Sequence, residues 1–314
     1  MKTIALDFGG TQIKIGIVEH DAILASRKIE ALSSGGLRPR LVRVEETIHE
    51  LLAASGIRIA DAAGIGISVP GIVDTRETTV LSVNEKYADS VGFDFSSWSR
   101  ERFSLPIVLE NDARAALTGE WRFGAGRGCD NIVMVTLGTG VGGAALIEGK
   151  LLYGKHYQAG CLGGHFTISY DGPACNCGNI GCVEAEASSW RLPLLAKDDP
   201  AYAGSLFSRA PVLDYEHLFA CAAQKDTLSE KLLRQSLLAW SSGIVNLIHA
   251  YDPERVIIGG GLMRSADIIL PFITSEVHKR AWTPWGKVTV VKAQDIDNAA
   301  LLGIAFLLNA HQHQ

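Results

Sequence analysis

The sequence Asp7-Phe8-Gly9-Gly10-Thr11 lies between two short apolar segments, Thr3–Leu6 and Ile13–Val18, whose composition predicts β-strands. Glycine adopts positive φ angles and lets the backbone approach a ligand closely, and successive N–H groups in such a turn bind anions. We therefore predict a phosphate-binding turn, in which Asp7 holds Mg²⁺ and Thr11 donates to a phosphate oxygen. A plain hairpin turn is the alternative interpretation of this stretch taken alone.

A related pattern returns in the second half of the chain. There, Gly138-Thr139-Gly140-Val141-Gly142-Gly143 separates the apolar segments Asn131–Leu137 and Ala144–Ile147. A third cluster, Gly259-Gly260-Gly261, follows the apolar strand Arg255–Ile258. Ligands of α/β proteins bind at the carboxyl ends of strands. Three glycine clusters, each directly after a strand, predict a nucleotide held between two lobes, and the repeated pattern predicts a duplicated α/β unit.

Strands and helices alternate along the rest of the chain, which is the pattern of an α/β fold. Residues 82–104 and 155–190 are predicted to be loops. The further predicted strands are Ile23–Ile29, Gly64–Val69, Pro106–Leu109 and Val288–Val291. The predicted helices are Arg40–Ser55, Asn111 to about Phe123, Asp226–Ala250 with Thr227 as its cap, Ala266–Arg280, and about Asp297 to Asn309.

Composition is that of a globular protein, with 47% apolar residues, 20% charged residues and a net charge of −5. The sequence has no basic stripe that would neutralise nucleic-acid phosphates, so no nucleic-acid partner is expected. The longest apolar stretch, Ile132 to Ile147, contains four glycines, and no membrane span is expected. Asp7 and the adjacent glycines interrupt the first apolar run before a signal peptide forms, so a cytoplasmic location is predicted.

A candidate general base follows the predicted strand Pro106–Leu109. Glu110-Asn111-Asp112 begins a helix there, and Asp112 is placed to accept a proton from a substrate hydroxyl. The helix N-terminus is expected to keep this carboxylate ionised. Asn111, beside it, is expected to bind a neighbouring hydroxyl. The alternative is that Asp112 serves only as the N-cap of the helix.

Three of the six cysteines lie within eight residues, and such a tight cluster in a cytoplasmic protein favours metal ligation over disulfides. His165, Cys175, Cys177 and Cys182 form a His/Cys₃ set that suits tetrahedral Zn²⁺. Four protein ligands leave no open position, so the predicted zinc is structural. Cys161 is a spare candidate ligand. Glu184 would be held rigidly by the zinc loop, with its carboxylate exposed to sugar hydroxyls.

Together these residues resemble the ROK family of sugar kinases and repressors over nearly the whole chain. The opening family motif is matched by Asp7, Gly9, Gly10 and Thr11, the catalytic pair by Asn111 and Asp112, the second phosphate motif by Gly138–Gly143, and the signature C-x-C-G-x-x-G-C-x-E by Cys175 to Glu184. The resemblance, which extends to glucokinases, N-acetylmannosamine kinases and fructokinase-like members, implies an actin-like ATPase (ribonuclease H-like) fold. That fold has two lobes with a cleft between them.

The resemblance also implies Mg-ATP as donor, a small-molecule sugar as acceptor, and usually a homodimer. We predict one lobe over residues 1–112, with the last helix (about 297–314) packing back on it, and a second over 113–296 with the zinc loop. Asp112 would be the base. The positions at which the family contacts the sugar are matched by Gly71, Asn84, Asn111, His165 and Glu184. Those at which it binds phosphate are matched by Gly138, Thr139 and Gly140, and those that line the adenosine by Gly259, Gly260 and Gly261.

One departure concerns the sugar site. Glucokinase-like members carry E-x-G-H before the cysteines, and that glutamate binds the sugar. Here the segment is Cys161-Leu162-Gly163-Gly164-His165, so the glutamate position holds Leu162 or Cys161 according to the direction of counting. Loss of an acceptor weakens binding of the hydroxyl it served. We expect a substrate other than plain glucose, such as a hexose modified at C1 or C2, with Lys86 either solvated or facing an anionic or polar substituent.

Two rival functions are considered. Repressors of the family carry an N-terminal helix-turn-helix, for which a phosphate loop starting at residue 7 is expected to leave no room. A sugar-binding or regulatory protein with weak catalysis is the second rival, because the usual glutamate is absent. Retention of Asp112 and of all three glycine loops favours an ATP-dependent sugar kinase.

Overall fold

The computed structural model describes residues 1–312, so residues 313 and 314, which the prediction includes in the last helix, lie outside the described residues. The chain forms two compact units. The first contains Met1–Asp130, Ala144–Cys161 and the chain from Ala293 onward, and the second contains Asn131–Gly143 and Leu162–Lys292. The boundary predicted at residue 112 therefore lies inside the first unit.

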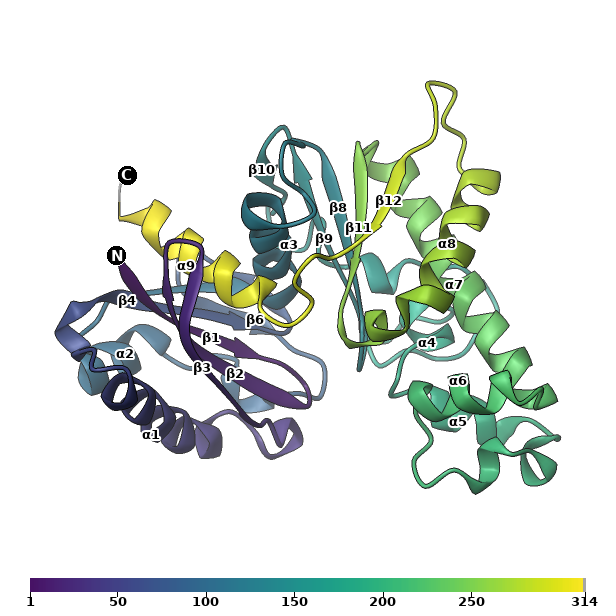
Figure 1. The fold of residues 1–314 in the computed structure, drawn as a ribbon, viewed down its shortest axis with the longest axis horizontal. Helices are drawn as coiled ribbons and strands as arrows, with labels where there is room; N and C mark the ends of the chain where they lie inside the picture. Colours follow the sequence, from purple (N-terminus) through teal and green to yellow (C-terminus); the bar gives the residue numbers. More distant parts are fainter. Residues whose placement is uncertain (313–314) are drawn as a thin grey trace. The chain divides into compact units, whose positions relative to one another are not determined.

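The sheet of the first unit has the order β3-β2-β1-β4-β7 (Figure 1). β1 (Lys2–Phe8), β2 (Gln12–Glu19) and β3 (Ala22–Glu30) are antiparallel neighbours, whereas β4 (Ala62–Val69) and β7 (Ile107–Asn111) run parallel to β1. Carboxyl ends of parallel strands meet at one edge of a sheet. The predicted site residues that follow β1, β4 and β7 therefore lie along the same edge.

Alternation along β1 explains how the first sheet is covered on both faces. Ile4, Leu6 and Phe8 belong to a core that includes buried residues of α1 (Arg38–Ala54). Ala5 belongs to a second core with α9 (Ala299–His311), which contacts β1, β2, β4 and β7. The two-residue period thus gives each face its own helical layer.

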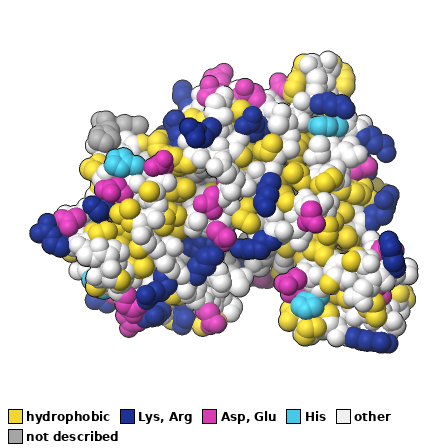
Figure 2. Space-filling view, in the orientation of Figure 1, with side chains coloured by type: hydrophobic (Ala, Val, Ile, Leu, Met, Phe, Trp, Pro, Cys, Tyr) yellow, Lys and Arg dark blue, Asp and Glu magenta, His cyan; other side chains and the backbone are white. Residues whose placement is uncertain are grey.

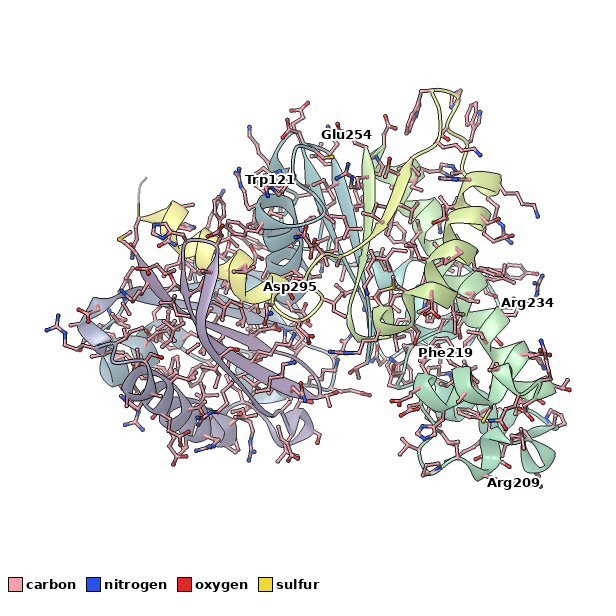
Figure 3. All side chains as sticks on the ribbon, viewed as in Figure 1. Trp121, Arg209, Phe219, Arg234, Glu254 and Asp295 are labelled. Carbon is pink, nitrogen blue, oxygen red and sulfur yellow. The ribbon has the colours of Figure 1, made fainter. Side chains whose placement is uncertain are left out.

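The helix that carries the predicted base packs closely on α9. α3 (Asp112–Phe123) and α9 meet at two glycines: a Cβ on Gly119 would lie 2.0 Å from the Ala299 carbonyl oxygen, and one on Gly303 would lie 1.8 Å from that of Ala115. Glu120 adds to this junction by accepting hydrogen bonds from the backbone N–H groups of Gln294 and of Asp295, which is labelled in Figure 3. The position of α3 is therefore set from the C-terminal end of the chain.

The second sheet repeats the strand order of the first, as β10-β9-β8-β11-β12. β8 (Ile132–Leu137), β11 (Arg255–Gly259) and β12 (Thr289–Lys292) are parallel, and β9 (Val141–Ile147) and β10 (Lys150–Leu151) form an antiparallel hairpin. The chain passes from the second unit to the first within β9. Both sheets have the order third, second, first, fourth, fifth, and this confirms the predicted duplication.

Helices of the second unit cover its sheet and extend beyond it. α7 (Thr227–Tyr251) contacts β8 and packs on α8 (Ala266–Arg280), and the shorter α6 (Tyr215–Ala223) packs on α7. α4 (Val183–Glu186) and α5 (Leu192–Asp198) also contact α7. None of the helices in residues 1–312 is long and apolar enough to cross a bilayer.

Several local predictions were wrong. Residues 82–104 contain α2 (Phe95–Phe103), capped by Asp94, because Phe95 and Trp98 bury an apolar face that the polar surroundings conceal in the sequence. The predicted loop 155–190 contains α4. The cap of α7 is Asp226, whose carboxylate accepts the Ser229 N–H, and not Thr227. A small hairpin of β5 (Ile72–Asp74) and β6 (Thr79–Ser82) was not predicted.

Candidate active site

The turn after β1 has the features of an anion-binding loop. Gly9 donates its N–H to the carbonyl of Gln12, and a Cβ on Gly9 would lie 2.8 Å from that oxygen. The N–H groups of Gly10 and Thr11 donate to no acceptor among residues 1–312. Two adjacent N–H groups without partners at a glycine turn form a suitable cradle for phosphate oxygens.

Asp7, which precedes this turn, is a buried carboxylate with two partners. Ser68 on β4 donates its hydroxyl to Asp7 Oδ1 at 2.8 Å, and Lys14 on β2 places its ammonium 3.6 Å from Asp7 Oδ2. The Lys14 ammonium also donates to the carbonyl of Asp297 before α9. Asp7 is therefore held in position by its neighbours, and any Mg²⁺ it faced would compete with the Lys14 cation for Oδ2.

Asp112 begins α3, but it is not the cap of the helix. Asn111 has that role, because its side-chain oxygen accepts the Arg114 N–H at 3.1 Å. Asp112 Oδ1 accepts hydrogen bonds from the Ala113 N–H and from the Asn111 amide. Oδ2 accepts none from residues 1–312. The interpretation of Asp112 as a mere cap is therefore wrong, and one carboxylate oxygen remains available for a substrate proton.

The pKa of Asp112 differs from the sequence-based expectation of a readily ionised helix-terminal carboxylate. Burial first, and the nearby Asp7 carboxylate second, raise the pKa of Asp112 to about 6. The Lys86 cation opposes this rise. A pKa near 6 leaves the group mostly ionised at neutral pH while making it a stronger base than an ordinary aspartate, which suits general-base catalysis.

This pKa predicts the acidic limb of the pH–rate profile. The base must be ionised to accept a proton, so kcat/KM should fall as the pH drops through about 6 rather than through 4. A profile of kcat/KM between pH 4.5 and 8.5, corrected for irreversible inactivation at each pH, checks this. A limb that stays flat down to pH 5 would contradict the raised pKa.

Asn111 and Gly71, both predicted to contact the sugar, also hold the loop after β4 in place. The Asn111 amide donates to the Gly71 carbonyl at 2.9 Å and to Asp112, so both of its hydrogens are used. Gly71 has φ +101°, and a Cβ there would lie 2.3 Å from the Ser82 carbonyl oxygen. Asn84 is exposed on the next turn. Asn111 thus acts in the structure as a scaffold for its neighbours.

A buried network behind Asp112 was not predicted from the sequence. Glu110 is almost fully buried, accepts the Tyr153 hydroxyl at 2.7 Å, and lies 3.7 Å from the guanidinium of the fully buried Arg114. Arg114 also donates to the carbonyls of Tyr157 and Ala159. Burial raises the pKa of Glu110, although the Arg114 cation opposes this effect. The signal in the sequence that could have indicated this ion pair is the four-residue spacing of Glu110 and Arg114.

This network holds the segment that ends at Cys161. The Cys161 thiol lies 3.5 Å from the Tyr157 carbonyl oxygen, to which it donates, and burial raises its pKa. Cys161 is in the first unit, whereas the other candidate zinc ligands are in the second, and it is absent from the metal-ligand cluster found among the described residues. Cys161 and Leu162 remain the two candidates for the position of the glutamate predicted in glucokinase-like members, and the raised pKa of Cys161 keeps its thiol neutral at pH 7.

The second glycine loop is built around Glu184. Glu184 accepts the Val141 N–H at 2.8 Å and the Trp190 indole N–H at 3.2 Å, and a Cβ on Gly140 would lie 2.3 Å from its carboxylate. Only glycine fits beside it. The side chain is buried, so the expectation of an exposed Glu184 carboxylate was wrong. Contact of Glu184 with a sugar stays a prediction.

The backbone of this loop resembles that of the first. The carbonyls of Gly138 and Thr139 accept the N–H groups of Ser189 and Trp190. The N–H groups of Thr139 and Gly140 have no acceptor within residues 1–312. Each unit therefore has a glycine turn with two adjacent unpartnered N–H groups.

The third glycine cluster follows β11. Gly260 has φ +87°, and a Cβ there would lie 2.3 Å from the Leu137 carbonyl oxygen at the end of β8. Gly259 ends the strand, and Gly261 begins a short 3₁₀ turn. Gly260 thus lets the turn after β11 approach the strand that leads into the second phosphate loop.

The predicted zinc ligands come together. The ligand atoms of His165, Cys175, Cys177 and Cys182 all lie within 4.8 Å of one another. Tetrahedral zinc ligands at Zn–S of about 2.3 Å and Zn–N of about 2.0 Å are separated by about 3.8 Å between sulfurs and about 3.5 Å between sulfur and nitrogen. Cys177 Sγ and Cys182 Sγ are 3.8 Å apart, and Cys175 Sγ is 3.6 Å from His165 Nδ1. The four residues fit a zinc ion.

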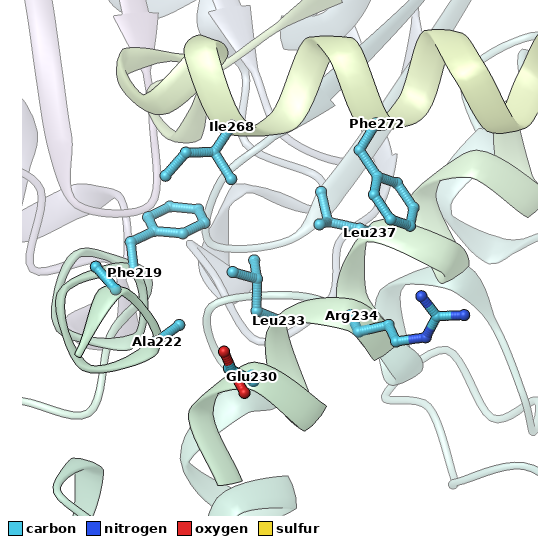
Figure 4. Close-up of a pocket in the computed structure, with 9 residues that line it drawn as sticks. Phe219, Ala222, Glu230, Leu233, Arg234, Leu237, Ile268 and Phe272 are labelled. Atoms are coloured by element: carbon cyan, nitrogen blue, oxygen red, sulfur yellow. The ribbon is translucent and has the colours of Figure 1, made fainter. Parts of the chain in front are cut away.

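The second unit also has an open apolar groove, whose lining residues include none of the candidate zinc ligands. It is lined by α6, α7 and α8, with Phe219, Leu237 and Phe272 facing it (Figure 4). None of the predicted site residues lines it. On the face shown in Figure 2, both basic and acidic side chains are present.

The chain is similar to several known proteins. A glucokinase of Thermotoga maritima is 32% identical over 98% of this chain and 97% of its own length. The xylose repressor of Bacillus subtilis is 30% identical over 79% of this chain and 61% of its own. A ROK family glucokinase from Streptomyces griseus, solved with glucose and AMPPNP, matches with TM-score 0.82 and 30% identity, over 99% of this chain and 100% of that one.

The kinases among these relatives confirm the predicted class of sugar kinase, and the structural match confirms the predicted actin-like ATPase fold. The profile of the ROK family matches residues 3–311. Spanning nearly the whole sequence, that match shows that the chain belongs to the ROK family.

Proposed function

We propose that this sugar kinase transfers the γ-phosphoryl group of ATP to a hydroxyl of a hexose or hexose derivative, with Asp112 as the general base. The observation that carries the proposal is the free Oδ2 of Asp112, a carboxylate with a pKa of about 6, on the same sheet edge as the glycine turn after β1. Positioning and charge stabilisation dominate phosphoryl transfer, and this edge supplies both.

The roles of the residues follow from their atoms. Asp112 accepts the proton of the attacking sugar hydroxyl, and the hydroxyl oxygen forms a bond to the γ-phosphorus of ATP. The bond between the γ-phosphorus and the β–γ bridging oxygen breaks, and ADP leaves. The unpartnered N–H groups of Gly10, Thr11, Thr139 and Gly140 bind phosphate oxygens. Gly259–Gly261 lines the adenosine. Mg²⁺ accompanies ATP as part of the substrate, and Asp7 is the carboxylate we assign to face it.

The acceptor that fits best is a hexose modified at C1 or C2, not plain glucose. Gly71, Asn84, Asn111, His165 and Glu184 are the residues assigned to the sugar. Cys161, one of the two candidates for the glutamate position, supports the modified acceptor, because a half-buried thiol of raised pKa is a poor hydrogen-bond acceptor for a sugar hydroxyl. A site without that acceptor loses less binding affinity when the sugar hydroxyl it would have bound is replaced or substituted.

A panel of sugars tests this function. ADP release from ATP is measured with aldohexoses, ketohexoses, amino sugars and glycosides, and at least one should give sugar-dependent turnover. A modified hexose should have a higher kcat/KM than glucose. Equal or better turnover of glucose would overturn the acceptor assignment while leaving the kinase intact.

A weakly catalytic sugar-binding or regulatory protein is the alternative. The observation that favours it is the similarity to the xylose repressor over 79% of this chain. In that case calorimetry would detect a sugar that binds with no sugar-dependent ADP release. We also propose that the protein is cytoplasmic and has no nucleic-acid or membrane partner. We propose that it forms a homodimer, and sedimentation of the purified chain tests this by measuring the mass of the assembly.

We further propose that His165, Cys175, Cys177 and Cys182 hold one structural Zn²⁺. The spacing of their ligand atoms supports this. The tight turn directly before Cys182 also supports it, because Gly181 has φ +61° there and a Cβ would lie 1.6 Å from the Ser169 carbonyl oxygen. Four ligands leave no open position for substrate water. The ion would secure the loop that carries Glu184 to the second glycine turn.

Metal content should therefore be close to one zinc per chain. Elemental analysis of protein purified without chelators measures it, and less than half an equivalent would contradict the site. Cys177→Ser, in which the exposed ligand is replaced, should lower zinc content and increase proteolysis between residues 165 and 184. Cys221→Ser is the matched control, because Cys221 is remote from the cluster in sequence and is not one of its members.

A further inference from the structure

Lys86 extends over the first glycine turn. An ideal Cβ on Gly10 would lie 2.9 Å from Lys86 Cε and 3.0 Å from its Nζ, so the ammonium lies directly against that turn. The side chain is half-buried, and it forms no ion pair with any residue from 1 to 312. A cation placed against two unpartnered N–H groups adds a full positive charge to an anion cradle.

The backbone around Lys86 is fastened to the glycine turn. Tyr87 is buried in the left-handed region, at φ 53°, and its hydroxyl donates to the Gly9 carbonyl at 2.9 Å. Its N–H donates to the Ser33 carbonyl, and the Ser33 hydroxyl donates to the Gly10 carbonyl at 2.9 Å. The Gly9 carbonyl is therefore bound by Tyr87, the residue after Lys86, and the Gly10 carbonyl by Ser33, to which Tyr87 is also hydrogen-bonded.

Lys86 also acts on the proposed base. Its positive charge lowers the pKa of Asp112, against the effects of burial and of Asp7. The cation is therefore electrostatically coupled both to the group that accepts the proton and to the turn that binds phosphate. A lysine held only by solvent would have neither relation.

We propose that Lys86 contacts the transferring phosphoryl group, because its ammonium lies against Gly10 and the neighbouring residue, Tyr87, is hydrogen-bonded to Gly9. The inference rests on the proposed kinase function. Lys86 forms no covalent bond and keeps its proton: the bond from the γ-phosphorus to the bridging oxygen breaks, the bond to the sugar oxygen forms, and Asp112 takes the hydroxyl proton. Charge that develops on the phosphoryl oxygens is stabilised by the ammonium.

Kinetics of Lys86→Met test the role. Loss of one preorganised charge partner should lower kcat roughly 10²-fold, with KM for the sugar changed by less than about threefold. Lys86→Arg should recover part of kcat. The acidic limb of kcat/KM should move to higher pH in Lys86→Met, because the cation that lowers the pKa of Asp112 is gone. Lys287→Met removes an exposed positive charge elsewhere and should change none of these quantities.

Binding distinguishes this inference from the function on which it rests. Calorimetry should show that Lys86→Met, or Lys86→Gln if the methionine variant unfolds, weakens AMPPNP binding about tenfold and leaves ADP binding unchanged. This result does not require turnover, so it is readable even if no sugar is phosphorylated. An unchanged kcat, an effect confined to the KM for the sugar, or equal weakening of AMPPNP and ADP would each overturn the proposal.

Discussion

Asp112→Asn should lower kcat by about 10²–10⁴-fold, the usual contribution of a general base. The asparagine keeps the shape of the side chain and the acceptor for the Ala113 N–H, and Asn111 still caps α3. Folding should therefore be preserved. The melting temperature should stay the same or rise. Burial raises the pKa of Asp112, which means that the charged carboxylate present at neutral pH destabilises the folded protein, and asparagine carries no charge.

The matched control is Asp267→Asn, which removes an exposed aspartate from the first turn of α8. It should leave kcat within about twofold, the range expected where no catalytic interaction is removed. Steady-state kinetics at pH 8, where Asp112 is ionised, give the comparison. Full activity in Asp112→Asn would refute its assignment as the base.

Gly303→Ala should destabilise the first unit strongly. The added methyl group would meet the Ala115 carbonyl oxygen at 1.8 Å and the Gly119 nitrogen at 2.7 Å. Both atoms belong to the backbone of α3, which cannot rotate away as a side chain can. Overpacking costs about 1–3 kcal/mol, and a backbone clash belongs at the upper end of that range.

Differential scanning calorimetry should show a melting temperature lowered by roughly 5–10 °C. Activity should fall as well, because α3 begins with Asp112. Gly35→Ala is the control in the same unit, since a Cβ there would have no atom within 4 Å and its φ is not positive. A Gly303→Ala variant as stable as the control would show that the two helices separate easily.

Much of the fold could be predicted because its signals are local. The glycine turns after β1, β8 and β11 are visible as clusters, and the alternation of Ile13, Ile15 and Ile17 marks β2. The candidate zinc ligands are visible from their spacing in the sequence alone. Such features depend on residues that are neighbours in the sequence.

The features missed depend on contacts between distant residues. The Gly119–Gly303 contact joins helices whose glycines look unremarkable in the sequence, and the Tyr153–Glu110 hydrogen bond spans 43 residues. Burial of Glu184 could not be predicted for the same reason, since Val141 and Trp190 approach it only in the folded chain. The sequence also could not show the raised pKa of Asp112, which arises from burial and from Asp7.

The claim that this ROK protein phosphorylates a sugar at a site built on Asp112 is tested most directly by one assay. Sugar-dependent ADP release is measured for the wild-type chain and for Asp112→Asn across hexoses, amino sugars and glycosides. We predict turnover with at least one sugar, reduced about 10²-fold or more in the variant. No sugar-dependent ADP release from the wild-type chain with any of them would contradict the account.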